Sequence, residues 1–121
     1  MLGYKVFGAG IPGLAVQALC QDALTGISAA GTTQGTATAL TNAVNFISTV
    51  TANTGVILPA NSTAGDSVFI YNGGANSLKV YPTSGASINQ LSANASVTLA
   101  TNTGLILFCG STTQWGAVLS A

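Results

Sequence analysis

The sequence predicts an all-β protein, an antiparallel β-sandwich or jelly-roll-like domain of about seven or eight short strands with an irregular N-terminal arm. Three observations predict this fold class. Short apolar segments with a period of two recur at a spacing of about 8–12 residues over most of the chain. Clusters of Gly, Asn, Pro and Ser, which favour turns, separate these segments. No crossover helices lie between them, which argues against a parallel α/β fold. A closed barrel satisfies the same pattern and stays open as an alternative.

The chain changes character near residue 35. Residues 1–34 are predicted to form the arm, extended or partly helical, because six of them are glycine and they show no sustained hydrophobic period. Leu14, Leu19 and Leu24 would share one face of a short helix, but no clear N-cap precedes it. Residues 35–121 are predicted to form the β-sandwich or jelly-roll-like domain.

The first predicted strand covers residues 44–51, where apolar and polar residues alternate. Val44, Phe46 and Val50 alternate with asparagine and threonine, so we expect these three side chains to point into the core. A second strand is predicted at residues 55–58, where a proline follows and cannot continue a central ladder.

The middle of the chain predicts a β-hairpin. Residues 67–71 read as a strand with Val68 and Ile70 on its inner face. The Asn-Gly-Gly sequence at residues 72–74 favours a tight turn, because such turns need residues that tolerate positive φ. The strand predicted at residues 78–81 is then expected to pair back, antiparallel to the first.

Further apolar segments follow as far as the C-terminus. The segment at residues 105–109 is almost entirely apolar, which is typical of a strand buried on both faces. The remaining strands are predicted around residue 88 and at residues 97–99 and 115–119.

Charged side chains are nearly absent. The chain has two lysines, two aspartates and no histidine, so only 3% of its residues are charged, against about 25% in a typical soluble domain. Enzymes need titratable groups to carry protons or activate nucleophiles, and two lysines cannot neutralise the phosphates of a nucleic acid. We therefore expect no catalytic, cofactor or metal site and no nucleic-acid partner.

Membrane binding is not expected either, because no apolar run reaches the ~18 residues of a membrane span.

Residues 8–13 match the Gly-x-Gly-x-x-Gly fingerprint of dinucleotide-binding proteins. No acidic residue follows about 20 residues later to bind a ribose, where Ser28 stands instead, and no second βαβ unit follows. We therefore interpret the motif as part of a glycine-rich arm.

Cys20 and Cys109 have no spacing typical of a metal site and no histidine near them. Two buried free thiols, or one disulfide that ties the arm to the last strands, are both consistent with the sequence.

The aromatic residues suggest an interface. Phe69, Tyr71 and Tyr81 are expected on one face of the predicted hairpin, opposite its inner apolar face. Two apolar faces imply that both are covered, so we predict that these three residues lie in a contact between subunits. A sugar-stacking platform that includes Trp115 is the alternative.

Several blocks of the sequence resemble small structural proteins of tailed bacteriophages. These blocks lie within residues 31–118, a stretch of about three quarters of the chain, and include the sequences GTTQGTA, GVILPA and NGGAN. They lie at residues 31–37, 40–41, 55–60, 64–68, 72–76, 78–82 and 85–89, followed by Cys109 and Trp115.

Among such proteins the chain looks most like a capsid decoration, or cement, protein. The resemblance implies a β-rich homotrimer on the outer surface of the virion head, where it clamps neighbouring copies of the major capsid protein, its expected partner. It also implies contacts through an arm and a subunit interface, and no catalytic centre. The first 25 residues match no block, so the arm is assigned to capsid contact from its own apolar side chains. These are Tyr4, Phe7, Ile11, Leu14, Leu19 and Leu24.

Two other functions fit the composition. A tail or fibre component, or an adhesin module, would bind a host-surface glycan through exposed aromatic side chains. A bacterial surface or pilus-like subunit would share the Thr- and Asn-rich surface, but it would be expected to carry a clearer export signal.

Overall fold

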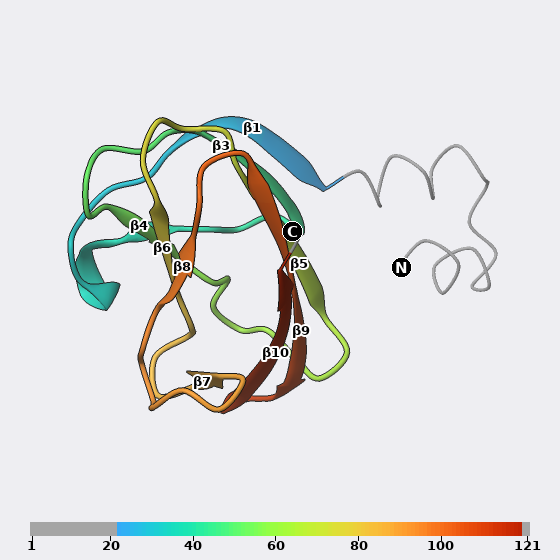
Figure 1. The fold of residues 1–121 in the computed structure, drawn as a ribbon. Coiled ribbons are helices and arrows are strands. Elements are labelled where there is room, and N and C mark those ends of the chain that lie inside the picture. The colour runs from blue at the N-terminus through green and yellow to red at the C-terminus, as the bar shows by residue number, and fades with distance from the viewer. Residues whose placement is uncertain (1–21, 120–121) are drawn as a thin grey trace, which may run out of the picture.

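A computed structural model describes residues 22–119 and shows an all-β fold (Figure 1). A single 3-10 turn, η1 (Gln34–Thr36), is the helical element among these residues. The strands are β1 (Ala23–Ser28), β2 (Thr38–Ala39), β3 (Val44–Thr49), β4 (Gly55–Ile57), β5 (Ser67–Asn72), β6 (Leu78–Tyr81), β7 (Ser87–Ile88), β8 (Val97–Leu99), β9 (Thr103–Ser111) and β10 (Gln114–Leu119).

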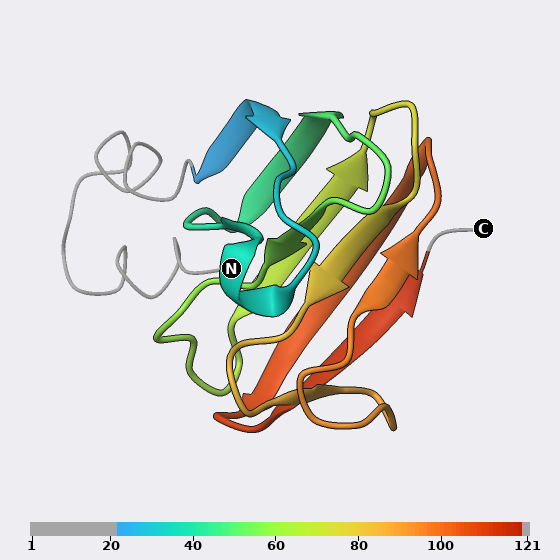
Figure 2. The same cartoon turned by 90° about the vertical axis from the view of Figure 1, so that its left-hand side faces the viewer.

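The strands form two stacked sheets between which the chain alternates. One sheet has six strands in the order β1-β3-β5-β9-β10-β7, and the other has four in the order β2-β4-β6-β8. The pairs β1–β2, β3–β4 and β5–β6 are therefore three successive coils. Each coil lies parallel to the one before it, β1 on β3 on β5 in one sheet and β2 on β4 on β6 in the other. This is a β-solenoid-like stack (Figures 1 and 2).

The all-β character is confirmed, whereas the predicted antiparallel sandwich or jelly roll is wrong. Antiparallel pairing joins only β9 to β5 and β10, and β8 to β6. The period of two locates a strand in the sequence but carries no information on its partner. Parallel neighbours without crossover helices are possible here, because each coil returns through a short strand of the opposite sheet.

The predicted hairpin is also wrong, because β5 and β6 belong to different sheets. Asn72 makes the corner between them. Its side chain is buried, its Nδ2 donates to the carbonyls of Asn76 and Leu99, both at 2.9 Å, and its Oδ1 accepts from the Gly74 N–H at 2.9 Å. Neither Gly73 nor Gly74 has a positive φ, so the turn that predicted the hairpin is not formed.

Glycine is required at position 74 because the backbone there packs closely against the neighbouring coil. A Cβ at this position would lie 2.6 Å from Val50 Cγ2 and 2.8 Å from the Val50 backbone nitrogen. We expect Gly74→Ala to lower the free energy of unfolding by about 1–3 kcal/mol, as overpacked cores do. Gly35→Ala is the matched control, because no atom lies within 4 Å of its Cβ position. Urea denaturation of both variants measures the difference, and equal midpoints would contradict this account of the corner.

The side chains of β3 face the opposite way from the prediction, although Val50, which follows the strand, is buried as predicted. Asn45 and Ile47 point into the core, while Phe46 points outward and is 42% exposed. The buried Asn45 Nδ2 donates to the carbonyls of Asn42, at 2.9 Å, and Phe69, at 3.3 Å. These two bonds offset the cost of burying the amide nitrogen, whereas the buried Asn45 Oδ1 has no hydrogen-bond partner.

The core lies between the two sheets. In β5 and β6 the buried residues are those predicted, Val68 and Ile70 in one strand and Leu78 and Val80 in the other. Trp115 from β10 is fully buried as well, and its Nε1 lies 3.3 Å from Thr83 Oγ1. Other core side chains are Ile27, Leu40, Ile47, Val50, Val56, Leu58, Ala86, Ile88, Leu99, Leu105, Leu107 and Cys109.

β1 is an edge strand with irregular pairing. Its register with β3 shifts on both sides of Ile27, and Gly26 has a φ of +70°. Most of the strand is exposed, with Ile27 as its buried residue. The six-stranded sheet therefore ends in a bulged strand, formed by residues that the sequence assigned to the arm.

Candidate functional site

The outer surface of the six-stranded sheet is strongly apolar, and we call it the apolar face. The register aligns Val44, Phe69, Ile106 and Val118 in one row across four strands. Residues in the same row of a sheet point to the same side, so these four side chains are neighbours. The apolar face consists of Val44, Phe46, Phe69, Tyr71, Ile106, Phe108 and Val118.

Four of these large apolar side chains are exposed, and the other three, Val44, Phe69 and Tyr71, are half-buried. Ile106 is 41% exposed, Phe108 51% and Val118 63%. None of the seven side chains of the apolar face is charged. Isolated exposed apolar residues are normal, but contiguous patches mark contact surfaces in soluble proteins.

Three aromatic rings form the side of the apolar face nearest β3. The ring centroid of Phe46 lies 6.0 Å from that of Phe69 and 5.6 Å from that of Tyr71, both in tilted arrangements. Aromatic pairs at such distances stabilise each other beyond their buried area. The rings therefore form a pre-ordered apolar surface.

The structure brings together only two of the three residues predicted to form an interface. Phe69 and Tyr71 lie side by side on β5, half-buried. Tyr81 lies on β6 in the other sheet, is buried, and donates from its hydroxyl to the Thr32 carbonyl at 3.2 Å. Trp115, named for a sugar platform, is buried in the core and has no free face for a ligand.

The sequence missed Phe46, Ile106 and Phe108 as surface residues. In β9 every second residue is buried, but the residues between them are also apolar, so the period of two is hidden. The register with β5 reveals it, because Ile106 pairs with Phe69 and Phe108 with Ser67.

Most of the predicted capsid-contact arm lies outside the described residues. This is true of Tyr4, Phe7, Ile11, Leu14 and Leu19, and also of the glycine-rich motif at residues 8–13. The sixth residue of that set, Leu24, lies on β1 and is 47% exposed.

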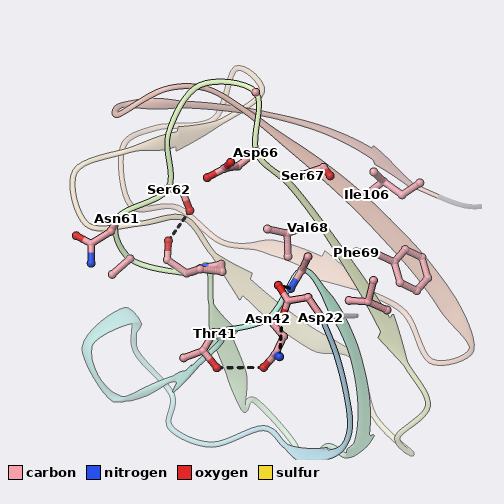
Figure 3. A pocket seen from close by; sticks show the side chains of 15 residues that line it. Asp22, Thr41, Asn42, Asn61, Ser62, Asp66, Ser67, Val68, Phe69 and Ile106 are labelled. Atoms are coloured by element: carbon pink, nitrogen blue, oxygen red, sulfur yellow. Dashed lines mark hydrogen bonds between the residues drawn. The ribbon is translucent and has the colours of Figure 1, made fainter. Parts of the chain in front are cut away.

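A groove with a volume of about 420 Å³ opens beside the apolar face (Figure 3). It is lined by Phe69 and Ile106 of that face, by the loop at residues 59–66, and by the segment at residues 41–44. Asp22 and Asp66, the two acidic residues of the chain, both line it. The groove therefore combines an apolar wall with all of the carboxylate side chains.

Both aspartates are held by hydrogen bonds, Asp22 from the segment before β3 and Asp66 from its own turn. Asp22 Oδ2 accepts from the Ala43 N–H at 2.9 Å and its Oδ1 accepts from Asn42 Nδ2 at 2.7 Å. Asp66 Oδ2 accepts from the Thr63 N–H at 2.9 Å. Neither carboxylate has a cationic partner among residues 22–119, and no basic side chain of that range lines the groove.

The chain matches no known protein family, no curated protein and no solved structure. Its function must therefore be argued from the apolar face and the groove.

Cys109 is a buried free thiol whose Sγ lies 3.1 Å from the Ser111 carbonyl oxygen. Burial, followed by the charge of Asp66, raises the pKa of this thiol. The thiolate that would be the reactive form is therefore disfavoured. Cys20, the other cysteine, lies outside the described residues.

Two further observations concern the described part of the chain. Residues 22–119 contain no group of three or more His, Cys, Asp or Glu side chains placed to hold a metal ion. Within the same residues no helix is long and apolar enough to cross a membrane.

Proposed function

We propose that this chain is a virion structural protein of a tailed bacteriophage. Specifically, it is a capsid decoration protein that binds the outer face of the head as a homotrimer and clamps neighbouring coat subunits. The observation that carries this proposal is the apolar face, a contiguous and uncharged surface across four strands of the six-stranded sheet. The resemblance of several sequence blocks of the chain to cement proteins supports the same function.

The apolar face suits contact between copies of the chain. Desolvating a charged group on association is costly, and this face carries none. Interface cores are depleted in charge and enriched in aromatic residues, as this face is. In the proposed trimer each copy turns its apolar face toward a common threefold axis, with Phe69 and Tyr71 in the subunit contact. Tyr81 contributes to the core of its own subunit.

Attachment to the coat is assigned to the N-terminal arm and to the exposed Leu24 at the start of β1. Three arms on one trimer bind with avidity, so weak individual contacts add up to firm attachment. The alternative of glycan binding loses its main residue, because Trp115 is buried.

The proposal predicts a trimer whose mass does not depend on salt. Light scattering of the purified protein should give the mass of three chains at both low and high ionic strength, because ion pairs contribute little to an uncharged contact. The trimer should also co-sediment with DNA-free heads that lack this chain. A monomer at both ionic strengths, or a trimer that stays in the supernatant, would contradict the proposal.

A further inference from the structure

The groove beside the apolar face carries negative charges that no basic side chain of residues 22–119 neutralises. It holds Asp22 and Asp66, while the third charged residue of the described part, Lys79, lies on β6 in the other sheet. Residues 22–119 therefore carry two negative charges and one positive, and both negative charges are at the groove. Figure 3 shows the two aspartates on opposite sides of it, with Phe69 and Ile106 at one end.

We propose that, in the protein not attached to heads, this groove binds the N-terminal segment of the same chain, with Lys5 between the two aspartates; attachment to the coat then requires the segment to leave the groove. A cation flanked by apolar side chains is the chemistry that the groove fits. The remaining charge of the chain, Lys5, has that setting, because Tyr4 precedes it and Val6 and Phe7 follow it.

The position where the segment joins the described structure supports this occupant. Asp22 is both the first described residue and part of the groove wall, so the N-terminal segment is covalently joined to the described structure at the groove. Sixteen residues, 6–21, separate Lys5 from Asp22. Fully extended they would span about 50 Å, so the chain is long enough for Lys5 to return. Because the segment is tethered, its effective concentration at the groove is high.

The size and lining of the groove agree with a short stretch of chain. Its volume of about 420 Å³ lies at the lower end of the range for sites that enclose small ligands, about 300–1,000 Å³. Val44 and Val68 provide apolar contacts for the neighbours of Lys5. The carboxylate of Asp66 is only half-buried and retains Oδ1 as an acceptor for the lysine ammonium.

The sparse charges of the chain permit a direct test. A carbodiimide joins a lysine amine to a carboxylate in contact with it, forming an amide with loss of one water. With two lysines and two aspartates, every side-chain link can be identified by mass spectrometry. We expect a link from Lys5 to Asp66, about tenfold more abundant than any link from Lys79 to Asp66. Lys5→Arg, which keeps the charge but does not react, should abolish it, and so should Asp66→Asn.

Two further measurements test whether the link forms within one chain and whether the groove is occupied. Mixing isotope-labelled and unlabelled chains shows whether the link forms within one chain; links between chains would overturn the proposal in favour of a second copy in the groove. Methyl NMR signals of Val68 and Ile106 should shift in Lys5→Glu and stay unchanged in Lys5→Arg. No link together with unchanged signals in Lys5→Glu would overturn it as well. These experiments use the purified protein, so their result is independent of whether the trimer binds heads.

Discussion

Replacing Phe108 with aspartate is expected to convert the proposed trimer into monomers. Phe108 is half-exposed on β9, in the uncharged apolar face. In the trimer, three copies of the new carboxylate would be desolvated near one another without cationic partners. Burying an ion costs several kcal/mol even after relaxation, and each 1.4 kcal/mol is a tenfold change in an equilibrium constant. Light scattering should therefore give the mass of one chain at concentrations where the parent protein is a trimer.

Thr98→Asp is the matched control for this experiment. Thr98 is exposed on β8 in the other sheet, directly opposite Lys79 on β6. The variant adds the same charge to an outer sheet surface, but away from the apolar face, and should remain a trimer. Val118→Asp, at the most exposed position of the apolar face, should behave like Phe108→Asp. If all three variants remain trimers, the apolar face is not the subunit contact. Circular dichroism verifies that each variant is folded.

Replacing Asn72 with alanine is expected to be the most destabilising single change outside the hydrophobic core. The substitution leaves the carbonyls of Asn76 and Leu99 and the N–H of Gly74 without their side-chain partner. Each buried polar group that loses its partner costs about 1–3 kcal/mol. A loss of about 3–5 kcal/mol is a large part of the ~5–15 kcal/mol by which domains are stable.

Asn76→Ala is the control that shows whether removing any asparagine side chain from this loop lowers the stability equally. The Asn76 side chain makes one bond, from Nδ2 to the Val50 carbonyl at 2.9 Å, in a less buried setting. Its removal should cost about 1 kcal/mol. Urea denaturation followed by tryptophan fluorescence compares the two, because Trp115 is buried in the core. Similar midpoints for both variants would show that the corner at Asn72 does not depend on its three bonds.

The sequence was sufficient to locate most strands but not to pair them. Turn residues and a period of two placed strands close to β3 to β10, because these signals are local. The partner of each strand depends on contacts between residues far apart, and the Asn-Gly-Gly sequence pointed to the wrong one. Asn72 explains the error: its side chain bonds the backbone of its own loop and of β8, so the chain turns into the other sheet.

The candidate site was predicted only in part for a related reason. Phe69 and Tyr71 were correctly placed on one outward face, because β5 alternates clearly. Phe46 was placed inward because it alternates with polar residues, whereas the buried residue is Asn45, whose Nδ2 has two backbone partners. The groove is lined by residues from separate coils, so no local sequence pattern predicts it. β1 and β2 were missed because they are irregular or short.

The bulged edge at β1 also limits how the protein can polymerise. Coils stacked in parallel present an open end to which further copies could add, one after another, and such growth would produce filaments rather than closed particles. The shifts in register around Ile27 and the left-handed Gly26 interrupt the row of backbone donors and acceptors on which a new strand would grow. A nearly uncharged protein has little electrostatic repulsion to keep its copies apart. The geometry of β1 therefore makes this edge of the six-stranded sheet a poor template for the addition of further copies.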